Sequence, residues 1–141
     1  MWTCPTCDKR FARKNQWHSC ANIDLQRHFN EKDPKLRKIF DALVSRIREF
    51  GDIRMNPVKS SVQFLASTTF LSVKVLRDSL NLEFYLKEKQ ERFPIYKTLQ
   101  LSSKKIVHFI RISSNKEIDR QLVFWLKESY NLNSRPVKGT H

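Results

Sequence analysis

Hydrophobic positions along the chain show two periods, a helical one between residues 34 and 51 and an alternating one from residue 52 to residue 113. The first segment matches the i, i+3, i+4, i+7 spacing of an amphipathic helix. Its apolar positions are Leu36, Ile39, Phe40, Leu43, Val44, Ile47 and Phe50. Asp33 and Pro34 suit the start of a helix, and Gly51 suits its C-terminal cap. We therefore predict a helix between Asp33 and Gly51.

The alternating pattern that follows predicts a set of half-buried strands. The segment from Leu80 to Leu86 is the clearest, with apolar side chains on one face and Asn81, Glu83 and Tyr85 on the other. The other alternating sets are Ile53 and Met55; Val62, Phe64 and Ala66; Leu71, Val73 and Val75; Ile95, Lys97, Leu99 and Leu101; and Ile106, His108, Ile110 and Ile112. Most connections are hairpin-length and parallel crossovers need a dozen residues or more, so we expect an antiparallel meander.

A second helix is expected near the C-terminus. It is predicted to begin at Ser114, because Glu117 three residues later completes a capping box. Its buried stripe comprises Ile118, Leu122, Trp125 and Leu126. Beyond Asn131 the sequence loses its periodicity, so a flexible tail is expected there.

All three cysteines lie in the first twenty residues. With one histidine they give the spacing C-x2-C-x10-H-x-C, formed by Cys4, Cys7, His18 and Cys20. Four such ligands suit a tetrahedral structural zinc site, and a full set leaves no open position for catalysis. The odd cysteine count disfavours a disulfide framework, and the lack of a βαβ unit disfavours a redox C-x2-C motif. The sequence thus predicts a knuckle stapled by Zn2+, with His28 as an alternative fourth ligand.

Together these elements predict an α+β fold in three parts. A zinc knuckle spans 1–22, an α+β domain spans 23–130, and a flexible tail spans 131–141. The domain is expected to contain the long helix, a five- to six-stranded antiparallel meander sheet and the C-terminal helix. No stretch approaches the roughly 18 apolar residues of a membrane span, and the N-terminus lacks a signal-peptide core. We therefore expect a cytoplasmic protein without membrane contact, whose oligomeric state the sequence leaves open.

Charge narrows the choice of partner. The 141 residues carry 27 Lys+Arg against 14 Asp+Glu, a formal net charge of +13 that is spread over the whole chain. Such a surface attracts polyanions, of which nucleic acid is the commonest in cells, although solubility alone explains it equally well. Around the knuckle, cations suited to phosphates alternate with rings suited to unpaired bases. These candidate nucleic-acid-binding residues are Lys9, Arg10, Phe11, Arg13, Lys14 and Trp17.

Two features limit that interpretation. Trp2 and Trp17 could be buried against the metal, and this interpretation is as good as one in which their rings are exposed to stack on bases. The ten residues between Cys7 and His18 are also too few for the ββα finger that reads bases in the major groove, so direct base readout by that route is disfavoured.

A second candidate site lies in the predicted sheet. His108 shares a face with isoleucines, which is typical of a hydrogen-bonded core residue, and Lys59 reads as an ordinary surface lysine. If the two instead converge at the mouth of a cavity, they form a site for a phosphate or carboxylate. No catalytic motif is present. The sequence therefore favours a non-enzymatic nucleic-acid-binding protein, with a ligand-binding or catalytic domain and a protein-interaction adaptor as alternatives.

Several segments resemble one family. Residues 1–7 (Met-Trp-Thr-Cys-Pro-Thr-Cys), 11–13 (Phe-Ala-Arg) and 15–20 (Asn-Gln-Trp-His-Ser-Cys) resemble a group of small, mostly bacterial proteins filed as domain-of-unknown-function family 5655. The likeness continues through Pro57, Val58, Lys59, Phe64, Phe70 and His108. The resemblance implies an α+β domain in the cytoplasm, and it implies no known reaction.

Overall fold

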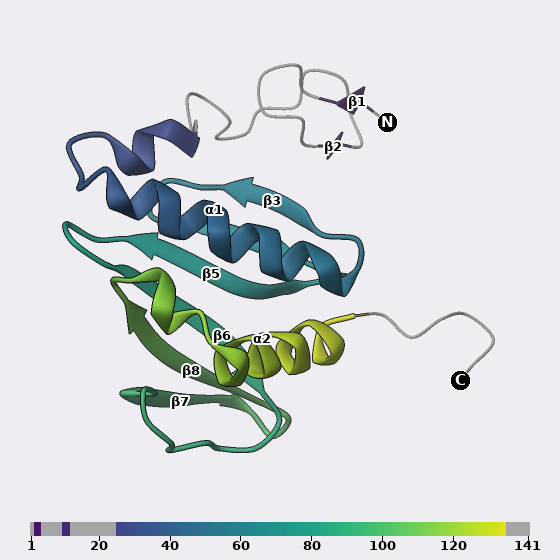
Figure 1. The fold of residues 1–141 in the computed structure, drawn as a ribbon. Helices are drawn as coiled ribbons and strands as arrows, with labels where there is room; N and C mark the ends of the chain where they lie inside the picture. Colours follow the sequence, from purple (N-terminus) through teal and green to yellow (C-terminus); the bar gives the residue numbers. More distant parts are fainter. Residues whose placement is uncertain (1, 4–9, 12–24, 135–141) are drawn as a thin grey trace.

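Residues 25–134 fold into a six-stranded antiparallel sheet with two α-helices packed on the same face (Figure 1). A computed structural model describes residues 2–3, 10–11 and 25–134. The sheet strands are β3 (Arg54–Pro57), β4 (Val62–Leu65), β5 (Thr69–Val75), β6 (Leu80–Leu86), β7 (Lys97–Ser102) and β8 (Lys105–Ile112). The helices are α1 (Lys35–Ile47) and α2 (Arg120–Leu132), with 3-10 turns at Leu25–Phe29, Arg48–Phe50 and Asn115–Glu117. The α+β fold, with two helices and six strands, is confirmed.

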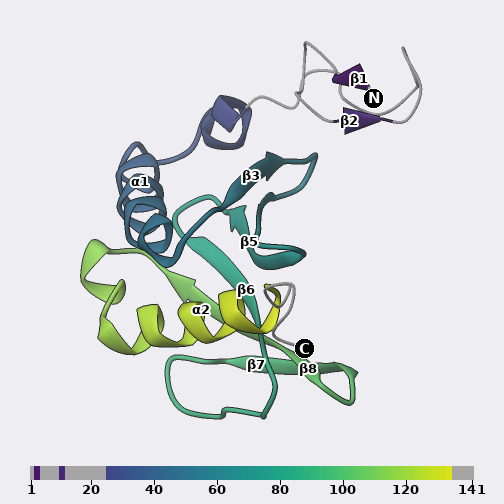
Figure 2. The same cartoon turned by 90° about the vertical axis from the view of Figure 1, so that its right-hand side faces the viewer.

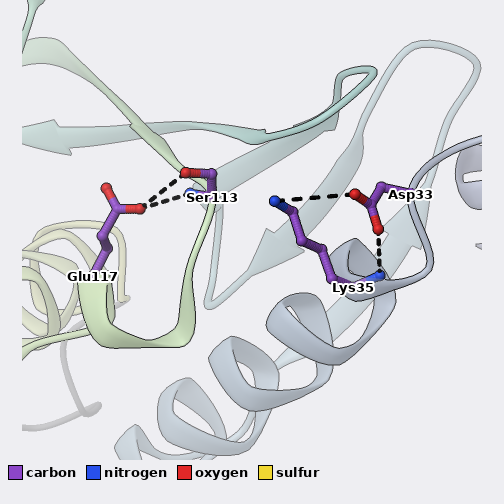
Figure 3. A network of polar contacts seen from close by, with 4 residues as sticks. All are labelled: Asp33, Lys35, Ser113 and Glu117. Atoms are coloured by element: carbon purple, nitrogen blue, oxygen red, sulfur yellow. Dashed lines mark hydrogen bonds and ion pairs between the residues drawn. The ribbon is translucent and has the colours of Figure 1, made fainter.

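Helix α1 forms where the hydrophobic spacing predicts it. Asp33 accepts the N–H of Lys35 at 3.0 Å and its carboxylate lies 4.0 Å from the Lys35 ammonium (Figure 3). This contact satisfies one of the free N–H groups of the first turn. The helix ends through a 3-10 turn at Gly51, which has φ of 148°. The buried face of α1 comprises Leu36, Ile39, Phe40, Leu43 and Ile47.

The order of the strands differs from a simple meander. The sheet runs β3-β4-β5-β6-β8-β7, with every neighbouring pair antiparallel, so β8 lies between β6 and β7. The prediction of a meander is therefore wrong at its last step. The physical reason is the segment 87–96, which is long enough to carry the chain past the position of β8. Strand β8 is also apolar on both faces through Val107 and Phe109, as an interior strand is expected to be.

One face of the sheet packs on the helices and holds the core (Figure 2). Phe84 lies near its centre, stacked on Trp125 of α2 with ring centroids 6.2 Å apart. The strand register places the following side chains on this covered face: Met55, Phe64, Leu71, Val73, Leu82, Thr98, His108 and Ile110. Most of them are fully buried, so this layer contributes the greater part of the hydrophobic stabilisation.

Helix α2 begins later than its sequence signals predict. Glu117 does accept hydrogen bonds from the Ser113 N–H and hydroxyl, at 2.8 and 3.3 Å, but it closes only a 3-10 turn (Figure 3). The α-helix starts at Arg120, after Asp119 accepts the N–H of Leu122 at 2.9 Å. The predicted start at Ser114 is wrong because Asp119 is the residue whose side chain caps the helix.

The far end of α2 is tied to the sheet. Asn133 is buried, accepts the N–H groups of Ser67 and Thr68 on its carbonyl oxygen, and donates from its amide to the Ser129 carbonyl at 2.8 Å. Residues up to Asn133 therefore belong to the folded domain, whereas the sequence places a tail from residue 131. The remainder of that predicted tail, 135–141, lies outside the described residues.

The side chain of Ser129 bridges two strands beside a β-bulge. Strands β4 and β5 shift register at Phe64 and Leu65, which leaves Phe70 as an extra residue in the bulge. The buried Ser129 hydroxyl donates to the Phe70 carbonyl at 2.6 Å and accepts the Tyr85 N–H at 2.9 Å. One side chain of α2 thus replaces the ladder hydrogen bond that the bulge removes between β5 and β6.

Candidate functional site

The second face of the sheet, called here the open face, is covered by neither α1 nor α2. In Figure 1 both helices lie in front of the strands, and the view in Figure 2 keeps them on that same side. Paired residues on neighbouring strands form rows across the open face. One row contains Asn56, Gln63, Ser72, Glu83, Phe109 and Lys97, the next contains Tyr85, Val107 and Leu99, and a third contains Lys74, Asn81 and Arg111.

Three cations of the open face lie over aromatic rings. The pairs are Lys97 over Phe109 at 5.2 Å, Lys105 over Tyr85 at 5.8 Å, and Arg111 over Tyr96 at 5.2 Å, each measured from the cationic group to the ring centroid. Each distance is within the roughly 6 Å at which a ring attracts a cation, an effect of about 0.5–1 kcal/mol at exposed sites. We call these six residues the aromatic–cation cluster.

Among the residues that the structure describes, the cations of this face form no ion pair with a carboxylate. Its cations are Arg54, Lys74, Lys97, Lys105 and Arg111, and the one acid that the register places among them is Glu83. Within the described residues the ion pairs join Lys35 to Asp33, Arg37 to Asp41 and Lys89 to Glu91, all away from the cluster. A ring holds a cation in place without cancelling its charge, so the cluster can still attract an anion.

Tyr85 is half-buried in this face. Burial, and then the nearby Glu83 carboxylate, raise the pKa of its phenol above the usual range. Its hydroxyl therefore stays protonated at neutral pH and remains a hydrogen-bond donor.

A cavity of about 280 Å³ opens at the edge of the cluster, between segment 87–96 and β7. It is lined by Lys89, Gln90, Glu91, Ile95, Tyr96, Lys97 and Thr98. We call it the loop pocket. It shares Tyr96 and Lys97 with the aromatic–cation cluster, whereas Thr98 of its lining belongs to the covered face, so the pocket lies around the edge strand β7 next to the cluster. The Tyr96 hydroxyl is hydrogen-bonded to the Asn81 side chain, and the backbone N–H of Tyr96 donates to the Phe109 carbonyl at 3.0 Å. These two bonds fix the wall of the pocket that Tyr96 forms.

His108 supports the loop pocket from the covered side of the sheet. It is fully buried and stacked on Phe84, with centroids 5.7 Å apart. Its Nε2 accepts the Gln90 N–H at 2.9 Å, so the proton resides on Nδ1, which donates to the Ile106 carbonyl at 2.9 Å. Burial lowers the pKa of His108 more than the bond to Ile106 raises it. His108 is therefore a neutral core residue that anchors segment 87–96.

The structure does not bring Lys59 and His108 together. Lys59 is exposed in the turn between β3 and β4, where the Val58 N–H donates to the Ser61 carbonyl at 2.8 Å. Three strand spacings separate β4 from β8, about 14 Å at the usual interval. An anion site shared by the two residues is not formed, and both ring nitrogens of His108 are already bonded.

The predicted zinc knuckle lies almost wholly outside the described residues. This applies to the metal ligands Cys4, Cys7, His18 and Cys20, and to the candidate contact residues Lys9, Arg13, Lys14 and Trp17. Arg10 and Phe11 form β2 (Arg10–Phe11), which pairs antiparallel with β1 (Trp2–Thr3). Among the described residues, no group of three or more His, Cys, Asp or Glu side chains is placed to hold a metal ion.

The hydrophobic pattern of the chain did not predict the open face, although residues that mark this face are present in the sequence. The residues opposite the core positions of β6 and β8 include Tyr85, Val107 and Phe109, which are unusual on a face exposed to water. A face that combines rings with cations on neighbouring strands is a stronger indicator than total charge, but the pairing of β8 with β7 is needed to find it.

Within the described residues no helix has the length and apolar character needed to cross a membrane.

Comparison with known proteins places the folded domain in a family. A family model described as "Domain of unknown function (DUF5655)" matches residues 25–133, which include both helices and all six strands of the main sheet. The match begins after the cysteine-containing segment, on which much of the resemblance noted from the sequence rests. No curated protein and no solved structure matched the chain. Because the match spans well over half of its length, the chain belongs to the DUF5655 family.

Proposed function

We propose that this protein binds nucleic acid through the open face of its sheet. The observation that carries the proposal is the aromatic–cation cluster, where Lys97, Lys105 and Arg111 lie over rings and, in the part of the chain that the structure describes, form no ion pair with a carboxylate. A polyanion supplies the counter-charges that this surface lacks. A nucleic acid also supplies flat bases that interact favourably with exposed rings and with guanidinium groups.

The cluster is suited to phosphate binding because its cations are already held near the surface. Ordering a free lysine or arginine costs up to about 2 kcal/mol in side-chain entropy, and the rings reduce that cost before any ligand arrives. Binding then releases counterions from the nucleic acid, which makes affinity depend on salt. The basic residues elsewhere on the chain, which carries +13 in total, would add non-specific attraction.

The N-terminal segment has a supporting part in this proposal. The spacing of Cys4, Cys7, His18 and Cys20 suits one structural zinc ion, which would order a segment too short to hold a core of its own. Lys9, Arg10, Phe11, Arg13, Lys14 and Trp17 would then add a second basic and aromatic surface. Both statements, and location in the cytoplasm, rest on the sequence alone.

A pair of charge-reversal variants tests the proposal. K97E/R111E changes two cations of the cluster, whereas K38E/R46E changes two exposed cations of α1 on the other side of the molecule. Both variants lower the formal net charge from +13 to +9, so they differ only in where charge is lost. Anisotropy titrations against labelled DNA and RNA, repeated across salt, measure affinity and its salt slope.

We expect K97E/R111E to weaken binding at least tenfold and to reduce the salt slope by about 1.4, which is two phosphate contacts at roughly 0.7 each on a single strand. K38E/R46E is expected to change affinity much less. Equal losses in the two variants would mean that net charge alone attracts nucleic acid. Wild-type affinity weaker than about 10⁻⁴ M at physiological salt would contradict the proposal outright. Capture of a protein partner that persists after nuclease treatment would favour the adaptor alternative.

A further inference from the structure

The proposed function leaves open which form of nucleic acid is bound, and the dimensions of the sheet bear on this. Six strands at about 4.8 Å give a surface about 24 Å across, whereas the major groove of B-DNA is about 12 Å wide and admits only two strands. The open face is therefore too broad to enter a groove. A duplex can touch it only through phosphates, which leaves the rings of the cluster without bases to contact.

Exposed apolar groups on the same face point to unpaired bases. Tyr96 is 47% exposed and Leu99 is 50% exposed, beside Phe109 and the buried Val107. The Tyr96 and Phe109 rings meet edge to face, with centroids 6.2 Å apart. Bases of a single strand are free to turn toward such a surface, because they are not held inside a helix.

The loop pocket provides a place for one such base. Its volume of about 280 Å³ is close to the lower limit of ordinary small-ligand pockets, about 300 Å³, so it fits one base and not a row of them. Its lining residues include Tyr96, Gln90 and Thr98, whose side chains carry an aromatic ring, an amide and a hydroxyl. A ring that contacts the base face, together with an amide and a hydroxyl that bond its polar edge, is the set of groups by which proteins hold a splayed-out base.

The pocket is also built from fixed parts. Segment 87–96 is anchored at its middle by the hydrogen bond from the Gln90 N–H to the buried His108. At its end, Tyr96 is bonded to Asn81 and to the Phe109 carbonyl. Lys97 lines the pocket and also lies over Phe109, so it is placed to contact the phosphate of whichever nucleotide enters. Because the pocket is already ordered, binding causes only a small loss of conformational entropy.

From these observations, and resting on the proposed function, we infer that the loop pocket receives one unpaired base and that the open face thereby selects single-stranded over duplex nucleic acid.

Three labelled probes of equal charge separate base contacts from phosphate contacts: a ten-nucleotide single strand, the same length of abasic strand, and a hairpin duplex. The variants are Q90A and T98V, which remove a polar side chain while the Gln90 N–H remains available to His108. Q100A is the matched control, because Gln100 is an exposed residue of the same edge strand that does not line the pocket.

We expect the single strand to bind at least tenfold more tightly than the abasic strand and the duplex at the same salt concentration. Q90A and T98V should each weaken single-strand binding about fivefold, the loss of one ordinary hydrogen bond of about 1 kcal/mol, without changing the salt slope. Neither should change duplex binding, and Q100A should behave as wild type.

The outcomes separate the two proposals. If none of the probes binds, the proposed function fails and this inference fails with it. If all three probes bind equally and neither Q90A nor T98V has an effect, nucleic-acid binding stands and the base pocket is overturned. Chemical-shift changes in the Gln90 and Thr98 side chains on adding the single strand give a second reading that does not depend on the variants.

Discussion

His108 should make the stability of the domain depend on pH below neutrality. In the folded protein its ring is fully buried and neutral, with Nε2 accepting the Gln90 N–H. Protonation would place a second N–H against the Gln90 donor and would leave a charge in the core. Burial accordingly lowers the pKa of His108 in the folded state below the value of about 6.5 that an exposed histidine has in the unfolded chain.

The sign and size of the effect follow from proton linkage. Because the folded pKa is the lower one, the unfolded chain binds the proton first as the pH falls. The stabilisation is therefore complete above pH 6.5 and is lost as the pH falls from there toward the folded pKa. Between pH 7.0 and 5.5 the loss from one histidine is at most about 1.3 kcal/mol, for an unfolded pKa of 6.5.

Urea denaturation of wild type and H108Q at these two pH values measures the loss. Glutamine cannot titrate, so H108Q should be less stable at pH 7.0 and should lose less stability on acidification. The matched control is H28Q. His28 also has a pKa lowered mainly by burial, but it is only half-buried and does not contact segment 87–96 in the described structure.

The reasoning would be refuted if wild type and H108Q lost the same free energy of unfolding between pH 7.0 and 5.5. An NMR titration of the wild type gives an independent check in case H108Q folds poorly. Its His108 ring signals should show a pKa below 6.5, and a value at or above 6.5 would contradict the assigned hydrogen bonds.

Two further predictions concern other parts of the chain. S129A should lower the free energy of unfolding by about 2–4 kcal/mol in thermal or urea melts, because it leaves the Phe70 carbonyl and the Tyr85 N–H without partners. The control S134A, at the half-exposed end of α2, should lower it by less than about 1 kcal/mol. Equal effects of the two variants would argue against the bridge that Ser129 forms between Phe70 and Tyr85. Elemental analysis should find about one zinc ion per chain in the wild type and none in C20S, and the melting temperature of the main domain should change little. A wild-type protein that contains no metal and has reactive thiols would contradict the zinc assignment.

Much of the fold could be predicted from the hydrophobic pattern. Helix α1 and all six strands of the main sheet appear where helical and alternating periods occur. Burial of one face enforces those periods in the helix and in most of the strands, whereas Leu99 and Leu101 of β7 are 50% and 56% exposed. The order of the strands could not be read in the same way. Periodicity reports which residues face the core, and it carries no information on whether β7 or β8 lies beside β6.

The candidate site was predictable only in part. His108 could be interpreted as a core residue because it shares a face with isoleucines, and it is one. The aromatic–cation cluster could not be assembled from the sequence, because Tyr96 lies outside any strand and reaches Arg111 and Asn81 only through the turn that ends segment 87–96. Such contacts depend on tertiary placement and not on local spacing.

The insertion of β8 between β6 and β7 has a consequence for how the chain acquires its structure. Strand β7 has one neighbour, β8, and that neighbour is made after it. During synthesis β7 stays unpaired, and one edge of β6 stays unpaired as well, until the ribosome has released the residues beyond 105 that form β8. A chain that ends before β8 would therefore expose two unpaired strand edges at once, which is the condition under which sheets pair with other chains and aggregate.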